Sequence, residues 1–333
     1  MNASDVVLGT DAGPASEEPR VAAKAWLSGD SLFHAAAVFA AFVAATTLFA
    51  TVIAIAYDSR LSIHTFGIWA FLKSSEWNPV TQTFGAFPFI IGTLVSSTIA
   101  MILGVPLSFG VAVFIVEIAP EWIKRPVAGA IELLAAVPSI VYGLWGLVVF
   151  APVFSQVEPW INDTFGAIPW IGLLFKGPPV GIGMLTAGIV LAIMVLPYIS
   201  SIMRDVFMVV PSSLRESAYA LGATTWEVAW DVILPYTRSA VIGGIFLGLG
   251  RALGETMAVT FVIGNSNMLS ASLLMPSATI PSVLANEFTE ATTPLYVSSL
   301  IYLGLILIAV TLTVRFLAVL LIRHLGRKEG TAS

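Results

Sequence analysis

Hydrophobic residues are grouped in six long blocks along the chain, separated by polar segments. A helix needs about 20 predominantly apolar residues to cross the ~30 Å hydrocarbon core of a bilayer. Six windows meet this requirement: 34–57, 89–118, 127–153, 180–200, 240–263 and 297–322. The pattern therefore predicts an all-α integral membrane protein with a bundle of six transmembrane helices.

The composition agrees with this prediction. The 333 residues are 57% hydrophobic and only 11% charged, whereas a soluble domain carries about 25% charged residues because its surface faces water. The chain has no cysteine and three scattered histidines, so we expect neither a metal site nor a cofactor. No run of lysine or arginine favours nucleic acid as a partner.

Polar segments lie at both ends of the predicted membrane domain. Residues 1–30 do not contain the basic region followed by an apolar region that is typical of a cleaved signal peptide. We therefore expect a disordered cytoplasmic tail there. The transmembrane domain is expected over 31–325, including a cytoplasmic loop at 201–239, and a short cytoplasmic tail is expected over 326–333.

Positive charges predict the orientation, because cytoplasmic loops are enriched in lysine and arginine. With the amino terminus inside, ten basic residues fall in cytoplasmic segments and three (Arg60, Lys73 and Lys176) fall outside. This bias predicts a multi-pass protein of the cytoplasmic membrane with both termini in the cytoplasm. Three long external segments, 58–88, 155–179 and 264–294, are either ordinary connections or a docking face for an external partner.

The loop at 201–239 has the pattern of two short helices. Apolar residues recur at helical spacing up to Gly222, which is suited to end a helix, and Trp226 and Trp230 share one face of the second piece. Pro235 is expected to interrupt the chain before the fifth window. Apolar side chains on such helices indicate either a surface helix on the bilayer or a protein partner. Acidic residues such as Glu216 favour the protein partner, because anionic lipid would repel them.

Part of this loop resembles a known motif. Glu216-Ser-Ala218, Gly222 and Leu234-Pro235, at their spacing, resemble the coupling loop of the membrane subunits of ABC importers. The resemblance implies that Glu216, Ala218, Gly222, Leu234 and Pro235 contact a cytoplasmic ATPase. The chain lacks a Gly-x-x-x-x-Gly-Lys-Ser/Thr phosphate loop, since none of its five lysines follows a glycine. We therefore expect a transport subunit rather than an enzyme, with ATP hydrolysed by another chain.

Two charged residues stand inside the fifth window. Arg251 and Glu255 are four apart, which places them on one face of a continuous helix, and Thr256 follows. Gly244 and Gly248 precede them at a spacing that lets helices approach closely. A charge inside the bilayer is functional by default. One interpretation is an ion pair that locks two helices together. The other is a substrate pathway in which Arg251 offers donors to an oxyanion and Glu255 accepts a hydrogen bond from hydrogen phosphate.

Over 33–323 the chain is similar to the PstC-like membrane subunits of ABC phosphate importers. The resemblance lies in 84–93, 132–146, 250–259 and 280–288, together with the coupling loop. It implies the fold of an ABC importer permease, phosphate as the substrate, transport by alternating access, and a role for the candidate pathway residues Arg251, Glu255 and Thr256. It also implies a heterodimer with a PstA-like subunit, two PstB-like ATPases, a PstS-like external phosphate-binding protein and contact with membrane lipid.

Other classes of function remain open at this point. A sulfate or molybdate ABC permease is the nearest alternative, because the chemistry of the oxyanions overlaps. A proton-coupled secondary transporter would use Arg251 and Glu255 as a relay and would act without an ATPase. An intramembrane enzyme is disfavoured, because the sequence contains neither HExxH nor GxSxG.

Overall fold

The computed structural model describes residues 29–329. The expected tails, 1–30 and 326–333, lie largely outside these residues, although the last helix continues to Glu329. All regular elements of the described part are helices, in agreement with the predicted all-α class. The chain divides at Ile53–Ala54 into two units, which we describe separately. The first contains most of α1 (Gly29–Asp58), an apolar helix with exposed side chains.

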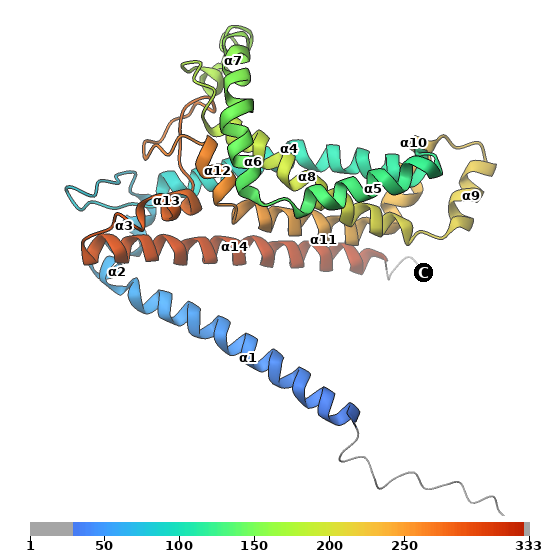
Figure 1. Cartoon of the computed structure of the whole chain (residues 1–333), viewed down its shortest axis with the longest axis horizontal. Helices are drawn as coiled ribbons and strands as arrows, with labels where there is room; N and C mark the ends of the chain where they lie inside the picture. Colours follow the sequence, from blue (N-terminus) through green and yellow to red (C-terminus); the bar gives the residue numbers. More distant parts are fainter. Residues whose placement is uncertain (1–28, 330–333) are drawn as a thin grey trace, which may run out of the picture. The chain divides into compact units, whose positions relative to one another are not determined.

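The second unit is a bundle whose long helices run along a common axis (Figure 1). They are α4 (Phe87–Val113), α8 (Met184–Met208), α11 (Leu234–Leu253) and α14 (Pro294–Glu329). The shorter α-helices are α2 (Arg60–Phe66), α3 (Ile68–Lys73), α5 (Glu121–Ala136), α6 (Ser139–Trp145), α7 (Ala151–Phe165), α9 (Ser212–Ala220), α10 (Thr225–Glu227), α12 (Met257–Val262) and α13 (Ile280–Glu287). Three π-helical turns, η1 (Phe114–Ile118), η2 (Gly146–Phe150) and η4 (Val228–Ile233), and the 3₁₀ turn η3 (Gly172–Phe175) complete the elements.

Six helical stretches of the described part are long and apolar enough to cross a membrane. They are Ser31–Asp58, Phe87–Ile118, Ser139–Phe165, Met184–Met208, Thr225–Leu253 and Pro294–Ile322. The number agrees with the six hydrophobic windows of the sequence. The fourth stretch ends at Met208 and so continues beyond the expected end at 200. The third and fifth stretches differ most from the expected windows in their boundaries.

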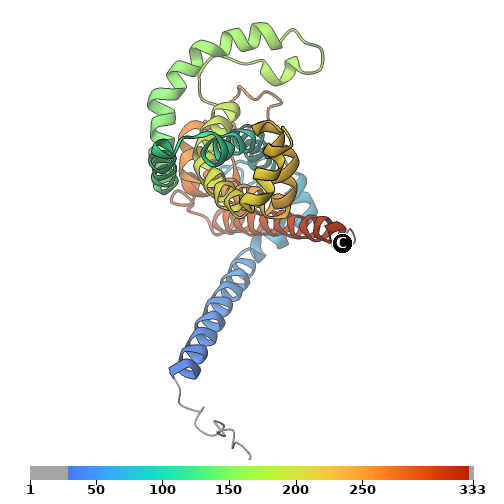
Figure 2. The same cartoon turned by 90° about the vertical axis from the view of Figure 1, so that its right-hand side faces the viewer.

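The third window, 127–153, is divided in the structure. α5 ends before Val137, whose backbone is extended (ψ 130), and α6 begins after Pro138. Proline disfavours helical backbone in the residue before it, which explains the break. α5 packs against α8, whereas α7 rises steeply away from the axis of the bundle in both views (Figures 1 and 2).

The fifth window, 240–263, is displaced toward the amino terminus. α10, η4 and α11 form one uninterrupted helical stretch from Thr225 to Leu253. The expected interruption at Pro235 is therefore wrong. This residue lies in the first turn of α11, directly after a π-helical turn, where a missing backbone N–H and the proline ring are tolerated. The stretch ends before Gly254, so α12 is a separate helix.

The main core lies where α8 packs against α4, α11 and α12. Gly244 and Gly248 of α11 face α8, as their spacing predicts: a Cβ atom on Gly248 would lie 2.6 Å from Cδ1 of Ile199. A second cluster at the end of the bundle that carries α13 is rich in aromatic residues, with Trp77, Phe84 and Tyr296 in mutual ring contact. The close glycine contact fixes the position of α11 and therefore of the charged residue near its end.

Candidate functional site

Arg251 lies in the last turn of α11, three residues before the helix gives way to Gly254. Its guanidinium is 5.3 Å from the ring centroid of Tyr198 on α8. Within residues 29–329 no carboxylate pairs with it, and its Nε is buried without a hydrogen-bond partner. The ring of Tyr198 contacts the guanidinium and leaves its donors available.

Glu255 does not share a helical face with Arg251. The helix ends at Leu253, and Glu255 lies in the connection to α12. Its Oε1 accepts a 3.3 Å hydrogen bond from the backbone N–H of Ala258, near the start of α12. The expectation of a continuous helix is wrong, and no ion pair joins Arg251 to Glu255 in the described part of the chain. Gly254, which has little helix propensity, ends the helix between them.

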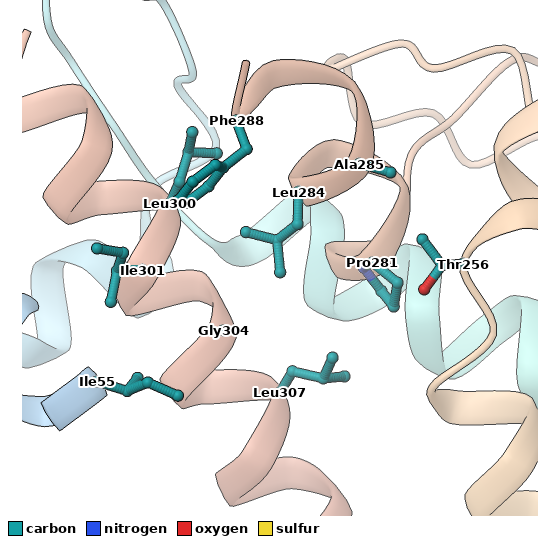
Figure 3. A pocket seen from close by; sticks show the side chains of 10 residues that line it. All are labelled: Ile55, Thr256, Pro281, Leu284, Ala285, Phe288, Leu300, Ile301, Gly304 and Leu307. Atoms are coloured by element: carbon teal, nitrogen blue, oxygen red, sulfur yellow. The ribbon is translucent and has the colours of Figure 1, made fainter. Parts of the chain in front are cut away.

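Thr256 lies beside an apolar cavity of about 600 Å³ between the α11–α12 connection, α13 and α14. Figure 3 shows its side chain directed toward Pro281, and Leu284 lies beyond Pro281 in the same cavity. Thr256 Oγ1 itself donates to the carbonyl of Gly254 at 3.3 Å. Apolar residues form nearly all of this lining, and Arg251 and Glu255 do not belong to it. Thr256 therefore lines a cavity to which Arg251 does not contribute.

At the opposite end of the bundle, α9 is a separate short helix, as expected for the first part of the loop (Figure 1). The expected second short helix is wrong, because α10 is the first turn of the long stretch from Thr225 to Leu253. α9 ends at a tight turn in which Gly222 has a φ of +91 and its N–H donates to Tyr219. A left-handed backbone favours glycine, as the sequence predicts. Trp226 and Trp230 stack with ring centroids 5.6 Å apart, which confirms that they share one face.

The five candidate coupling residues have different surroundings. Glu216 and Pro235 are exposed, and Gly222 has open space around it. Ala218 and Leu234 are half-buried against the main core. Exposed apolar side chains surround the turn, including Leu221, which is 90% exposed. This end of the bundle thus presents an exposed apolar surface. Ala218 and Leu234, which pack against the main core, hold this surface in position.

A carboxylate links α9 to the second spanning stretch. Glu117 of η1 accepts hydrogen bonds from Arg215 Nη1 and from the hydroxyl of Tyr219, both at 3.0 Å. Arg215 Nη2 also donates to the carbonyl of Val210 at 3.0 Å. Burial raises the pKa of Tyr219 above its ordinary value, more than its hydrogen bond with Thr225 lowers it, so this hydroxyl is a donor at neutral pH. These contacts hold α9 against the end of α4.

Sequence reasoning missed this linkage. Glu117 reads as an interfacial acid near the end of a window, and the pair is separated by 98 residues. Glu132 and Arg204 form a similar bridge between α5 and α8, at 2.9 Å. An acid near the end of an apolar window is the available signal for Glu117 and Glu132, but it does not indicate which basic residue each one contacts.

The chain matches a known protein family. The family described as "Binding-protein-dependent transport system inner membrane component" matches residues 104–329. A phosphate transport system permease protein PstC of Xylella fastidiosa (strain 9a5c) is 58% identical over 82% of this chain and 84% of that protein. The PstC of Pasteurella multocida (strain Pm70) is 52% identical over 90% of this chain and 93% of its own. A probable phosphate transport system permease protein PstC of Methanocaldococcus jannaschii is 35% identical over 85% of this chain and 89% of that protein.

A solved structure shows the same fold. A chain of the bacterial alginate ABC transporter, in complex with an alginate-bound periplasmic protein, superposes with a TM-score of 0.59. The match covers 87% of this chain and 93% of that one at 16% identity. The helical arrangement is therefore one that ABC transporter membrane subunits adopt.

Proposed function

The chain belongs to the family of binding-protein-dependent transport system inner membrane components, and from this membership we propose that it is the permease subunit of an ATP-driven phosphate importer. Its relatives at 58% and 52% identity, over most of both chains, are named phosphate permeases. Their names favour phosphate over sulfate or molybdate as the transported oxyanion. A proton-coupled transporter is also disfavoured, because the matching family depends on a binding protein.

The main observation in support of a transport pathway is that Arg251 has no carboxylate partner within the described residues. A membrane-embedded guanidinium without a carboxylate partner is costly unless a ligand uses it. Its planar fork of donors suits the oxygens of phosphate, and the ring of Tyr198 packs against it. Glu255 and Thr256 shape the break that follows it. Arg251 in this proposal touches the substrate, whereas Glu255 and Thr256 position the backbone next to it.

The surface around α9 and α10 supports an ATPase as the partner at the other end. Glu216 is exposed and makes no hydrogen bond or ion pair within residues 29–329. Leu221 and Trp226 beside it are 90% and 63% exposed. Apolar groups in water stabilise a complex when a partner covers them. Two copies of a PstB-like ATPase would bind this surface and that of a second permease subunit, and would supply the ATP hydrolysis for which this chain has no phosphate loop.

The orientation and the remaining partners follow from the same proposal. Both termini lie in the cytoplasm with α9, because the basic residues concentrate on that side. A PstA-like subunit completes the pathway, so that Arg251 lies between two permease chains in the cytoplasmic membrane. A PstS-like binding protein docks on the external segments, where Trp170 is 96% exposed. Closure of the ATPases then shifts the bundle between its two access states.

The test is reconstitution of the chain with its candidate partners in proteoliposomes. ATP hydrolysis is measured in two parallel assays. In one the binding protein is loaded with phosphate, and in the other sulfate is supplied in place of phosphate. We expect phosphate to stimulate hydrolysis and to accumulate inside the vesicles, and sulfate to do neither. Equal stimulation by the two anions would exclude the phosphate assignment, and uptake without any ATPase would favour the secondary transporter.

A further inference from the structure

We propose that a basic cavity beside α9 binds a phosphate group, with the headgroup of an anionic phospholipid as the favoured source. The cavity is distinct from the transport pathway, and none of its residues is among the proposed pathway or ATPase-contact residues. It lies between η1, α5, α8 and α9 and has a volume of about 360 Å³. Its lining consists of Ile115, Val116, Lys124, Arg125, Ala128, Arg204, Met208 and Arg215.

Half of this lining is cationic, and no acidic residue contributes to it. The four cations come from three helices: Lys124 and Arg125 from α5, Arg204 from α8 and Arg215 from α9. Like charges held around one space repel each other unless an anion lies among them. The cavity is large enough for a phosphate group and part of a glycerol backbone.

Three of the four cations pair with carboxylates that do not belong to the cavity lining. Glu117 pairs with Arg215 at 3.0 Å and is buried, so this pair stays in place. The other partners are exposed. Glu121 pairs with Lys124 at 2.9 Å, and its side chain is 85% exposed. Glu132 and Asp205 pair with Arg204, with side chains 59% and 60% exposed. Exposed pairs contribute little to stability, so an anion can compete for Lys124 and Arg204 at small cost.

Two groups of donors at the cavity have no partner. Arg125 is exposed and makes no hydrogen bond or ion pair within the described residues, so its donors are free to take a ligand. Nε of Arg215 is buried without an acceptor. Guanidinium groups form charge-assisted hydrogen bonds with phosphate oxygens. A bound phosphate group would supply acceptors that the chain does not provide itself.

The surroundings favour a lipid as the source. Ile118, Trp122 and Val209 flank the cavity in sequence and are 58%, 77% and 71% exposed. An exposed tryptophan among aliphatic side chains is typical of the headgroup level of a membrane. Basic pockets between membrane helices bind anionic headgroups, and the apolar Ile115 and Met208 in the lining suit the start of an acyl chain.

The experiment compares two double variants of the full chain, purified in detergent with its co-purifying subunits. Lys124→Gln with Arg125→Gln removes two cations of the cavity that contact none of the proposed pathway residues. Lys73→Gln with Lys176→Gln removes two exposed cations elsewhere and is the matched control. Bound phosphatidylglycerol is counted by native mass spectrometry during a titration, and binding of radiolabelled inorganic phosphate is measured by equilibrium dialysis.

We expect the cavity variant to bind phosphatidylglycerol about thirtyfold more weakly than the wild type, given the usual effect of two basic residues near an anionic lipid, and the control variant to match the wild type. If only the binding of inorganic phosphate weakens, the phosphate group comes from the free ion. If neither ligand is bound more weakly, or if the control variant loses as much, the proposal is overturned. A size-exclusion profile equal to that of the wild type shows that the variant is assembled.

Discussion

The Oε1 of Glu117 accepts a hydrogen bond from Nη1 of Arg215 at 3.0 Å, which joins the end of the second spanning stretch to α9. The Glu117 side chain is 7% exposed and that of Arg215 22%, so water screens this pair less than it screens the other ion pairs of the described part. This contact is therefore suited to transmit a movement of α9 to η1 and α4. If an ATPase binds α9, this contact connects it to the membrane bundle.

Glu117→Gln is expected to weaken this connection. A hydrogen bond to a charged group stabilises by about 1.5–3 kcal/mol, and the amide keeps the shape but loses the charge. The reconstituted variant should hydrolyse ATP with phosphate uptake per ATP reduced severalfold. Glu121→Gln, at a pair whose carboxylate is 85% exposed, is the control and should keep the normal ratio. An unchanged ratio in Glu117→Gln would show that the contact does not transmit movement.

Gly222 should tolerate asparagine better than alanine. Its φ of +91 is a left-handed conformation, which costs about 1–2 kcal/mol for a residue with a Cβ atom and less for asparagine. Since a Cβ atom at this position would have nothing within 4 Å, strain and not collision decides the result. We expect weaker ATPase binding for Gly222→Ala than for Gly222→Asn in a pull-down titration. Equal affinities would show that the turn is not needed in this conformation.

Arg251→Gln should reduce phosphate uptake roughly thirtyfold, the equivalent of about 2 kcal/mol for lost charge-assisted contacts. Arg315→Gln is the control, because Arg315 is also an arginine in a spanning stretch but is exposed on α14. Uptake is measured with radiolabelled phosphate at constant amounts of assembled transporter. Similar losses in both variants would indicate a general effect of charge in the membrane.

Two glycines of α11 are expected to respond with opposite sign to the same substitution. A Cβ atom on Gly248 would lie 2.6 Å from both Cδ1 and Cγ1 of Ile199, whereas one on Gly250 would have nothing within 4 Å. Gly248→Ala should destabilise the protein by about 1–2 kcal/mol through overpacking. Gly250→Ala should stabilise it by up to about 1 kcal/mol, because alanine favours a helix. Thermal unfolding in detergent measures both, and a lower Tm for Gly250→Ala would contradict the packing described above.

Local pattern was sufficient for much of this protein. A run of about 20 apolar residues is typical of a transmembrane helix and rare in soluble proteins. The number of spanning helices could therefore be predicted from hydrophobicity alone. The turn at Gly222 and the stacked face of Trp226 and Trp230 were predictable too, because backbone preference and helical spacing are properties of neighbouring residues.

Only the tertiary structure decided the contacts of the charged residues. The spacing of Arg251 and Glu255 predicts a shared face, but the helix ends at Leu253 and separates them. Nothing in the sequence indicates that Glu117 contacts Arg215, since they are 98 residues apart. Whether an apolar block spans the membrane depends on the free energy of transferring its side chains from water into lipid. This free energy is a property of each segment by itself. The pairing of acidic with basic side chains depends instead on how the helices pack against one another, and therefore on the whole chain.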